Sequence, residues 1–258
     1  MLFRIRLAAA TGIGQTGRMS APSTPGPRVL ILHGIWNARS WVAPLAWRLR
    51  AEGFDAEVFG YDSVFGGPEA AIPRLIDHLQ ASDGPIGLVG HSLGGVIALE
   101  TLRRQPDLPV SRVVCLGSPL RGSLTARNLA RHPWSAHALG RSGPLLLSGC
   151  AEWRGTAQVG MVAGNVARGF GRLLARFEGD SDGTVSVEET RLPGLSDHCI
   201  VAASHTGLVF SAEAAHQAAN FLRHGRFTHP QARETGAATG AGTNRGTPAS
   251  NGRTGAME

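Results

Sequence analysis

Ser92 is the residue whose surroundings most strongly indicate chemistry. It lies in the pentapeptide Gly-His-Ser-Leu-Gly, between Gly90 and Gly94, after a short apolar run. A strand that turns into a helix through Gly-X-Ser-X-Gly bends so tightly that the serine hydroxyl projects outward, and only glycines leave room for the two elements to pass. We therefore predict that Ser92 is a nucleophile; the alternative is a glycine-rich loop that only packs a helix on a strand. The apolar residues at helical spacing after it are Leu93, Val96, Ile97, Leu99 and Leu102.

A serine hydroxyl is nearly inert at neutral pH, so this prediction requires a base. Among the ten histidines, His205 follows the apolar run 198–204 and precedes a helix that begins near Ser211. In a doubly wound sheet, functional side chains stand on loops that leave the carboxyl ends of strands. We predict His205 as the base; the alternative is an ordinary histidine of a surface loop.

The acid that would orient the base is predicted in the stretch 177–185. Asp182 begins an Asp-Gly turn, from which a carboxylate can accept the imidazole N–H and hold the tautomer that leaves the other nitrogen free. Asp180 is the second choice. This pair could also be half of a calcium loop, but the later ligands of such a loop are missing, so we expect no metal site.

Negative charge that develops on a substrate carbonyl oxygen needs hydrogen-bond donors. The backbone N–H of Leu93, at the start of the predicted helix, is one candidate. The second is the N–H of Ile35, because Gly34 lets the backbone turn inward after the first strand; the alternative is a plain strand-ending turn. His33 and His91 neighbour these glycines, and the sequence does not fix where their side chains point.

Short β-type runs alternate with helix-type segments through most of the chain. The β-type runs are almost continuously apolar, as strands covered on both faces require. This alternation predicts an α/β fold with a doubly wound, mainly parallel sheet of about six strands and helices on both faces. The predicted strands are 28–33, 56–61, 86–90, 112–117, 158–163 and 198–203, and the predicted helices are 40–52, 73–81, 93–105 and 211–223.

Capping residues mark the expected ends of these helices. We predict Ser40 and Ser211 as N-caps and place Pro73 in the first turn of its helix, where a proline is tolerated. Residues 120–156 break the alternation because they form a long segment rich in glycine, serine and arginine. Such a segment is either a small cap over the site or a long connection that contains a helix, and the sequence does not decide between them.

Composition limits the organisation and the partners of the protein. The 258 residues are 42% hydrophobic, enough for one good core, and we expect a domain at 28–229 between disordered segments at 1–27 and 230–258. The net charge of +6 comes from the two ends around a nearly neutral body, which argues against a nucleic-acid-binding face. The sequence contains no run of eighteen apolar residues that could span a bilayer. The N-terminus resembles a signal peptide only faintly, so we expect a cytoplasmic protein.

The three cysteines indicate no special chemistry. Cys115, Cys150 and Cys199 are widely spaced and form no CxxC pair, and two of them fall in predicted buried strands. They fit small buried apolar residues rather than a disulfide framework or a zinc site. No cofactor is predicted.

Taken together, several motifs resemble the lipase and esterase branch of the α/β-hydrolase superfamily. Within it, the chain is most similar over residues 28–226 to compact bacterial lipases whose sheet lacks the first two strands of the full fold. The order Ser92, Asp182, His205 is the order of the α/β-hydrolases. The resemblance implies hydrolysis of a small-molecule ester or lipid through an acyl-serine intermediate, without a cofactor; it separates neither lipase from esterase nor hydrolysis from acyl transfer. The motifs are Leu-His-Gly-Ile-Trp at 32–36, Gly-His-Ser-Leu-Gly-Gly at 90–95, Gly-Ser-Pro-Leu-Arg-Gly-Ser at 117–123, Asp-Gly-Thr-Val at 182–185 and Ser-His-Thr-Gly-Leu-Val-Phe-Ser at 204–211.

Overall fold

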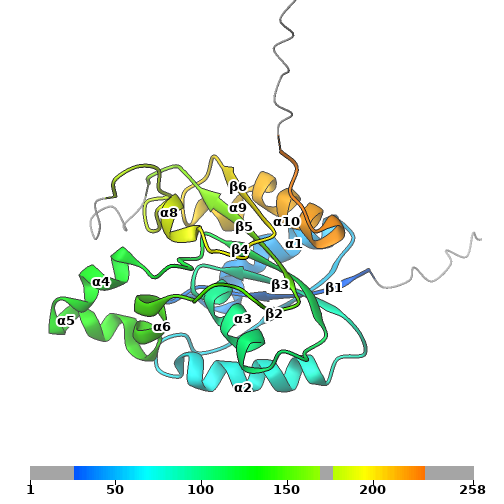
Figure 1. Cartoon of the computed structure of the whole chain (residues 1–258), viewed down its shortest axis with the longest axis horizontal. Helices are drawn as coiled ribbons and strands as arrows, with labels where there is room; N and C mark the ends of the chain where they lie inside the picture. The colour runs from blue at the N-terminus through cyan, green and yellow to red at the C-terminus, as the bar shows by residue number, and fades with distance from the viewer. Residues whose placement is uncertain (1–25, 169–176, 230–258) are drawn as a thin grey trace, which may run out of the picture. The chain divides into compact units, whose positions relative to one another are not determined.

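The computed structural model describes residues 26–168 and 177–229, which contain one six-stranded sheet (Figure 1). All neighbouring strands in it are parallel, so the predicted α/β class and strand number are confirmed. The predicted disorder of 1–27 and 230–258 lies outside the described residues, apart from Gly26 and Pro27. The strands are β1 (Arg28–Leu32), β2 (Asp55–Phe59), β3 (Ile86–His91), β4 (Val110–Leu116), β5 (Gln158–Gly164) and β6 (Asp197–Val201).

The order of the strands creates a switch point beside the predicted nucleophile. The sheet runs β2-β1-β3-β4-β5-β6, so the chain leaves β1 toward one edge and then continues from β3 toward the other. In open α/β sheets, the crevice outside the carboxyl ends of two strands that diverge in this way is the usual position of a ligand site. Here Gly34 follows β1 and Ser92 follows β3, so both border this crevice.

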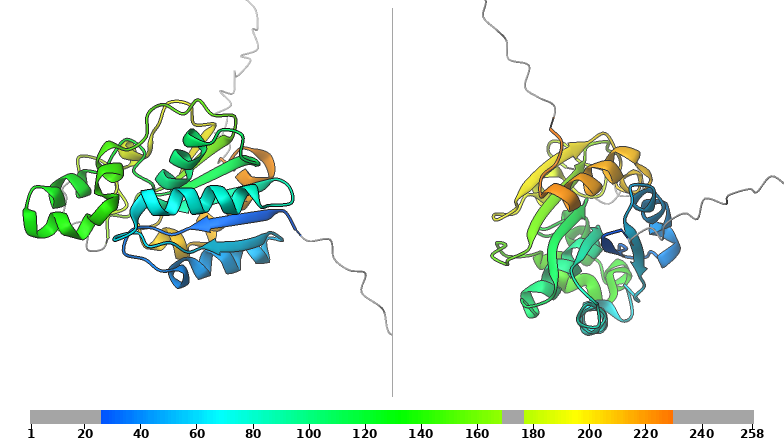
Figure 2. Two further views of the ribbon diagram at one scale, coloured as in Figure 1. Left: turned by 90° about the horizontal axis from the view of Figure 1, so that it is seen from below. Right: turned by 90° about the vertical axis from the view of Figure 1, so that its right-hand side faces the viewer.

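Helices cover both faces of the sheet (Figure 2). The strands alternate their side chains between these two faces. In β1, Leu30 and Leu32 belong to one core cluster, and Val29 and Ile31 belong to the other. Period-two alternation in a sheet buried on both sides explains why the sequence shows nearly continuous apolar runs. The first cluster contains side chains of α2 (Gly67–Gln80) and α3 (Leu93–Arg104), and the second contains side chains of α1 (Ala43–Ala51), α9 (Gly207–Phe210) and α10 (Ala212–His224).

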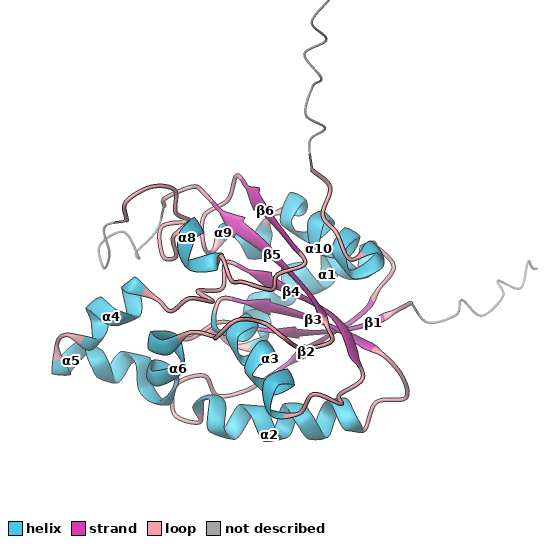
Figure 3. Cartoon of the chain, in the orientation of Figure 1, coloured by secondary structure: helices cyan, strands magenta, loops and turns pink. Residues whose placement is uncertain are grey.

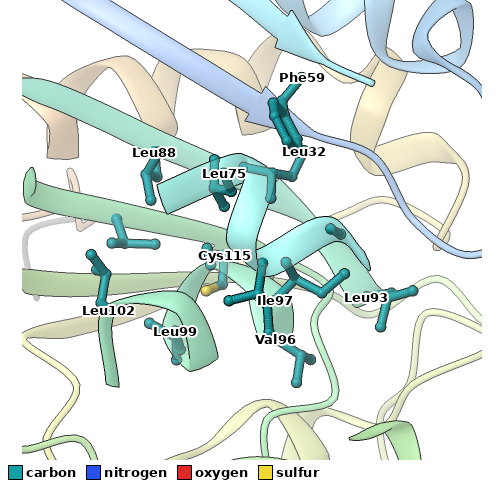
Figure 4. Close-up of a cluster of buried hydrophobic side chains, with 14 of the residues drawn as sticks. Leu32, Phe59, Leu75, Leu88, Leu93, Val96, Ile97, Leu99, Leu102 and Cys115 are labelled. Carbon is teal, nitrogen blue, oxygen red and sulfur yellow. The ribbon is translucent and has the colours of Figure 1, made fainter. Parts of the chain in front are cut away.

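The core under α2 and α3 fixes the helix that follows Ser92. Figure 4 shows Leu75 of α2 and Val96 and Ile97 of α3 in one buried cluster with side chains of the sheet. All three residues are at most 1% exposed, and burying each contributes roughly 1.5–3 kcal/mol. This packing holds the N-terminus of α3, and therefore Ser92, in place against β3.

Two predicted helix starts are wrong, and those at residues 93 and 211 are confirmed. Ser40 caps no helix: it lies within the 3₁₀ helix η1 (Arg39–Val42), which runs directly into α1 without a side-chain cap. Pro73 lies inside α2, because Pro68 takes the tolerated position in the first turn and the helix starts earlier. Pro73 removes one backbone N–H from the helix interior, and its neighbour Ile72 is buried in the core. Ser211 caps α10 as predicted, since its hydroxyl accepts the N–H of Ala214.

The segment 120–156 contains a succession of short helices (Figure 3). The Ser142 hydroxyl donates to the carbonyl of Ser63, at 2.6 Å, and so ties this segment to the loop after β2. A role of the segment as a cap remains a prediction. Among the described residues, no helix is both long and apolar enough to cross a bilayer. The helices are α4 (Leu124–Ala130), α5 (Pro133–Ala136), η2 (His137–Ser142) and α6 (Gly143–Ser148).

Candidate active site

Ser92 occupies a strained turn between β3 and α3. Its backbone has φ 54° and ψ −120°, a conformation that costs a non-glycine residue roughly 1–3 kcal/mol. The turn is held by the Ser92 N–H, which donates to the carbonyl of Leu116 on the neighbouring strand, at 2.9 Å. The strain and its restraint match the conformation that the Gly-X-Ser-X-Gly sequence predicts.

Close approach of neighbouring backbone segments requires glycine on both sides of Ser92. A Cβ at Gly90 would lie 2.3 Å from the backbone nitrogen of Gly95, and a Cβ at Gly94 would lie 2.5 Å from the carbonyl oxygen of Leu32. These distances are far inside van der Waals contact, so β3, α3 and β1 approach one another only because side chains are missing there. The spacing of the motif therefore follows from the close packing of a strand and a helix around the serine.

The three residues predicted as nucleophile, base and acid form one hydrogen-bonded row. His205 Nε2 lies 3.0 Å from Ser92 Oγ, and His205 Nδ1 lies 2.7 Å from Asp182 Oδ2. Because a carboxylate only accepts, Nδ1 carries the proton and the lone pair of Nε2 faces the serine hydroxyl. Asp180, the second choice for the acid, is exposed and accepts the N–H of Val187 through its backbone carbonyl.

Burial and backbone hydrogen bonds hold the Asp182 carboxylate in place beside the imidazole of His205. Its side chain is 1% exposed, and its Oδ1 accepts the backbone N–H groups of Thr184 and Val185 at 2.9 and 2.8 Å. Its own carbonyl accepts the N–H of His205 at 2.9 Å, which joins the loop of Asp182 to the base loop, residues 202–206 between β6 and α9. The His205 side chain is 13% exposed and Ser92 is 7% exposed, so the row is most deeply buried at the acid.

Gly117 packs against the Asp182–His205 pair, and the sequence analysis assigned it no role in the site. It follows β4 with φ 56°, and a Cβ there would lie 3.0 Å from Asp182 Oδ2 and 3.3 Å from His205 Nδ1. The pair therefore sits directly on the backbone of this glycine. The glycine that ends the predicted strand 112–117 was the available signal.

Two buried histidines flank the row. His91 Nε2 lies 3.0 Å from the carbonyl oxygen of His205, and burial lowers the pKa of His91 to about 3. The His33 ring stacks on Tyr61 with centroids 4.3 Å apart, its Nδ1 lies 2.9 Å from the Gly34 carbonyl oxygen, and burial lowers its pKa. Both imidazoles are therefore neutral near pH 7.

The candidate oxyanion donors lie on the two segments that border Ser92. Leu93 is the first residue of α3, where backbone N–H groups have no acceptor in the preceding turn. Ile35 follows Gly34, and a Cβ at Gly34 would lie 3.1 Å from the Cβ of Ser92. The loop after β1 therefore passes directly against the serine.

Aromatic side chains are exposed around the carboxyl end of the sheet. Trp36 is 55% exposed and its indole N–H donates to the carbonyl of Ala138 in η2, at 2.6 Å. Trp41 packs edge-on against Phe210 and is exposed, so neither tryptophan is an ordinary core residue. Phe65 is the most exposed of them and lines an open surface cavity of about 640 Å³. The other residues of this cavity are Val64, Ala136, His137, Gly140 and Arg141.

Comparisons with known proteins agree with this architecture. The sequence profile of the alpha/beta hydrolase family matches residues 29–237. The lipase BlEst2 of Bacillus licheniformis superimposes with a TM-score of 0.60 at 20% identity, over 79% of this chain and 93% of that one. The metagenomic carboxyl esterase MGS0156 gives 0.55 at 20% identity, over 74% and 69% of the two chains. The pyrethroid hydrolase PytH gives 0.55 at 14% identity, over 78% and 99%.

No curated protein sequence matches the chain. The structural likenesses, at these identities, establish the shared fold. The family profile covers most of the chain and includes the strands that precede Ser92 and His205. The chain therefore belongs to the alpha/beta hydrolase family.

Proposed function

We propose that this protein is a serine hydrolase of the lipase or esterase type, which cleaves small carboxylic esters or lipids through an acyl-serine intermediate. The observation that carries the proposal is the row Ser92–His205–Asp182, with contacts of 3.0 and 2.7 Å. Family membership supports hydrolase activity in general. Structural neighbours described as a lipase and a carboxyl esterase favour an ester as the substrate class.

Each residue of the row has one task in the proposed cycle. His205 Nε2 takes the proton of Ser92 as its oxygen attacks the ester carbonyl, and Asp182 stabilises the imidazolium that forms. The backbone N–H groups of Ile35 and Leu93 stabilise the oxyanion. His205 then protonates the departing alcohol. A water molecule, deprotonated by the same imidazole, attacks the acyl-serine, and His205 returns that proton to Ser92 Oγ as the acid is released. Apart from this water molecule and the substrate, the cycle uses only protein groups.

The proposal is tested on the purified chain with p-nitrophenyl esters and a fluorophosphonate probe. The parent protein is expected to hydrolyse the esters and to take the label at Ser92. Ser92→Ala removes the nucleophile and should lower kcat by about 10⁶-fold, as in other serine hydrolases whose catalytic residues act as a unit. Asp182→Asn should lower kcat by about 10⁴-fold, because an amide holds the wrong imidazole tautomer. Asp180→Asn is the matched control and should stay near the parent rate.

Two results would contradict the proposal. One is hydrolysis at the parent rate by Ser92→Ala; the other is a folded parent protein that neither hydrolyses esters nor takes the label, as a binding module on this fold would behave. Product analysis with an added alcohol separates hydrolysis from acyl transfer, since both outcomes share the acyl-serine.

A further inference from the structure

His91 directly contacts the segment that carries the proposed base. It is the residue before Ser92 and the last of β3, and its side chain is directed away from solvent, with the whole residue 2% exposed. Its Nε2 lies 3.0 Å from the main-chain carbonyl oxygen of His205, and the two rings have centroids 4.9 Å apart. A side chain on the nucleophile strand therefore contacts the backbone of the base loop.

The contact fixes the protonation of His91. A carbonyl oxygen only accepts, so Nε2 must carry the proton and donate. His91 Nδ1 has no hydrogen-bond partner among the described residues. The ionisable groups that interact with His91 are the imidazoles of His205 and His33 and the carboxylate of Asp182. Burial and the neighbouring His205 both favour the neutral form of His91.

A neutral residue suits this position. The imidazole of His205 becomes positively charged during the proposed cycle, and a second cation 4.9 Å away would oppose that step. A donor to the His205 carbonyl holds the base loop without adding charge. The other backbone contact of His205, from its N–H to the carbonyl of Asp182, holds the same residue toward the acid.

We propose that His91 is a positioning residue, whose neutral Nε2–H holds the main chain of His205 so that the base imidazole reaches Ser92. This inference rests on the proposed function for its kinetic consequences. Loss of the bond lets the His205 loop move, and a displacement of about 1 Å costs about 100-fold in rate. The loss falls on kcat, because the bond contacts the base and not the substrate.

Two variants separate the hydrogen bond from the bulk of the ring. His91→Phe keeps a ring but removes the donor, and it should lower kcat and the rate of fluorophosphonate labelling by about 10- to 100-fold while KM stays within about twofold. His91→Gln places an amide N–H near the Nε2 position and should recover most of that loss. His198→Phe is the matched control, because His198 is a partly buried histidine near the start of β6, four residues or more from the base loop. Its kcat should equal that of the parent protein.

A second readout does not depend on activity. The proton between His205 Nδ1 and Asp182 gives a far-downfield NMR signal whose shift and width report the position of the base. His91→Phe should shift or broaden this signal, and His91→Gln and His198→Phe should not. Thermal melting monitored by circular dichroism confirms that each variant is folded.

The outcomes distinguish the two proposals. An unchanged kcat and an unchanged NMR signal in folded His91→Phe would overturn the positioning role, as would an equal loss in His91→Gln and His91→Phe. A parent protein without ester hydrolysis or labelling would overturn the proposed function, and the NMR comparison would still decide the role of His91.

Discussion

Replacing Gly117 by alanine should damage both stability and activity, for reasons that can be separated. The residue has φ 56°, which costs an L-residue roughly 1–2 kcal/mol. The added Cβ would lie 2.7 Å from Leu208 Cδ1 and 3.0 Å from Asp182 Oδ2. Overpacking of this kind costs roughly 1–3 kcal/mol more. We therefore expect the free energy of unfolding to fall by about 2–5 kcal/mol.

Gly53→Ala isolates the first of these two costs. Gly53 also has a positive φ, of 87°, but a Cβ there would have no atom within 4 Å, and the residue lies between α1 and β2. Its unfolding free energy should fall by only about 1–2 kcal/mol and its kcat should not change. Gly117→Ala should also lose about 100-fold in kcat, since Asp182 and His205 must move to admit the methyl group.

Urea unfolding of both variants and ester hydrolysis by the folded fraction measure these effects. The steric reasoning would be refuted if Gly117→Ala lost no more stability than Gly53→Ala. It would also be refuted if Gly117→Ala kept the parent kcat, because the acid and the base would then not rest on the backbone of residue 117.

Two further predictions concern stability alone. The pKa of His91 is about 3 in the folded protein and near 6.5 in the unfolded chain, so only the unfolded chain gains this proton as the pH falls below 6.5. His91→Gln should therefore lose less unfolding free energy than the parent protein between neutral pH and pH 5, by about 2 kcal/mol. An equal loss of unfolding free energy in the two proteins, measured by urea titration at each pH, would contradict this. Ser211→Ala should cost about 1 kcal/mol in the same titration and Ser211→Asn should recover most of it, because the side chain at this position caps α10.

The fold was predictable because its signals are local. Apolar runs mark strands covered on both faces, and residues such as Ser211 mark helix ends through bonds to neighbours three positions away. The start of α2 was predicted wrongly because two local signals of the same kind compete to mark it. Pro68 and Pro73 can each occupy a first turn, and only the packing of the residues between them against the sheet shows that the helix begins at the earlier one.

The parts of the site that depend on contacts between distant segments were harder to predict from the sequence. Ser92 and its glycines lie within five residues and can be read as a motif, and order along the chain pointed to Asp182 and His205. The environments of His91 and Gly117 arise from segments distant in the sequence. The contact of His91 is with a residue 114 positions away. No residue spacing in the sequence predicts a contact between residues so far apart in the chain.

The sheet order explains why a glycine must follow β4. Ser92 follows β3, Gly117 follows β4 and His205 follows β6, and these strands are neighbours in the sheet in this order, with β5 between the last two. Strands β3 and β6 are three intervals apart, roughly 14 Å at about 4.8 Å per interval.

The base must therefore return across the sheet edge to reach the nucleophile. His205 lies four residues beyond Val201, the end of β6, and the Ala203 N–H donates to the Val201 carbonyl, so the chain turns sharply where the strand ends. After this turn the loop brings His205 over the end of β4, where a Cβ on Gly117 would lie 3.3 Å from His205 Nδ1. A side chain on residue 117 would stand in that path, so the reach of His205 and the glycine beneath it are two consequences of the same strand order.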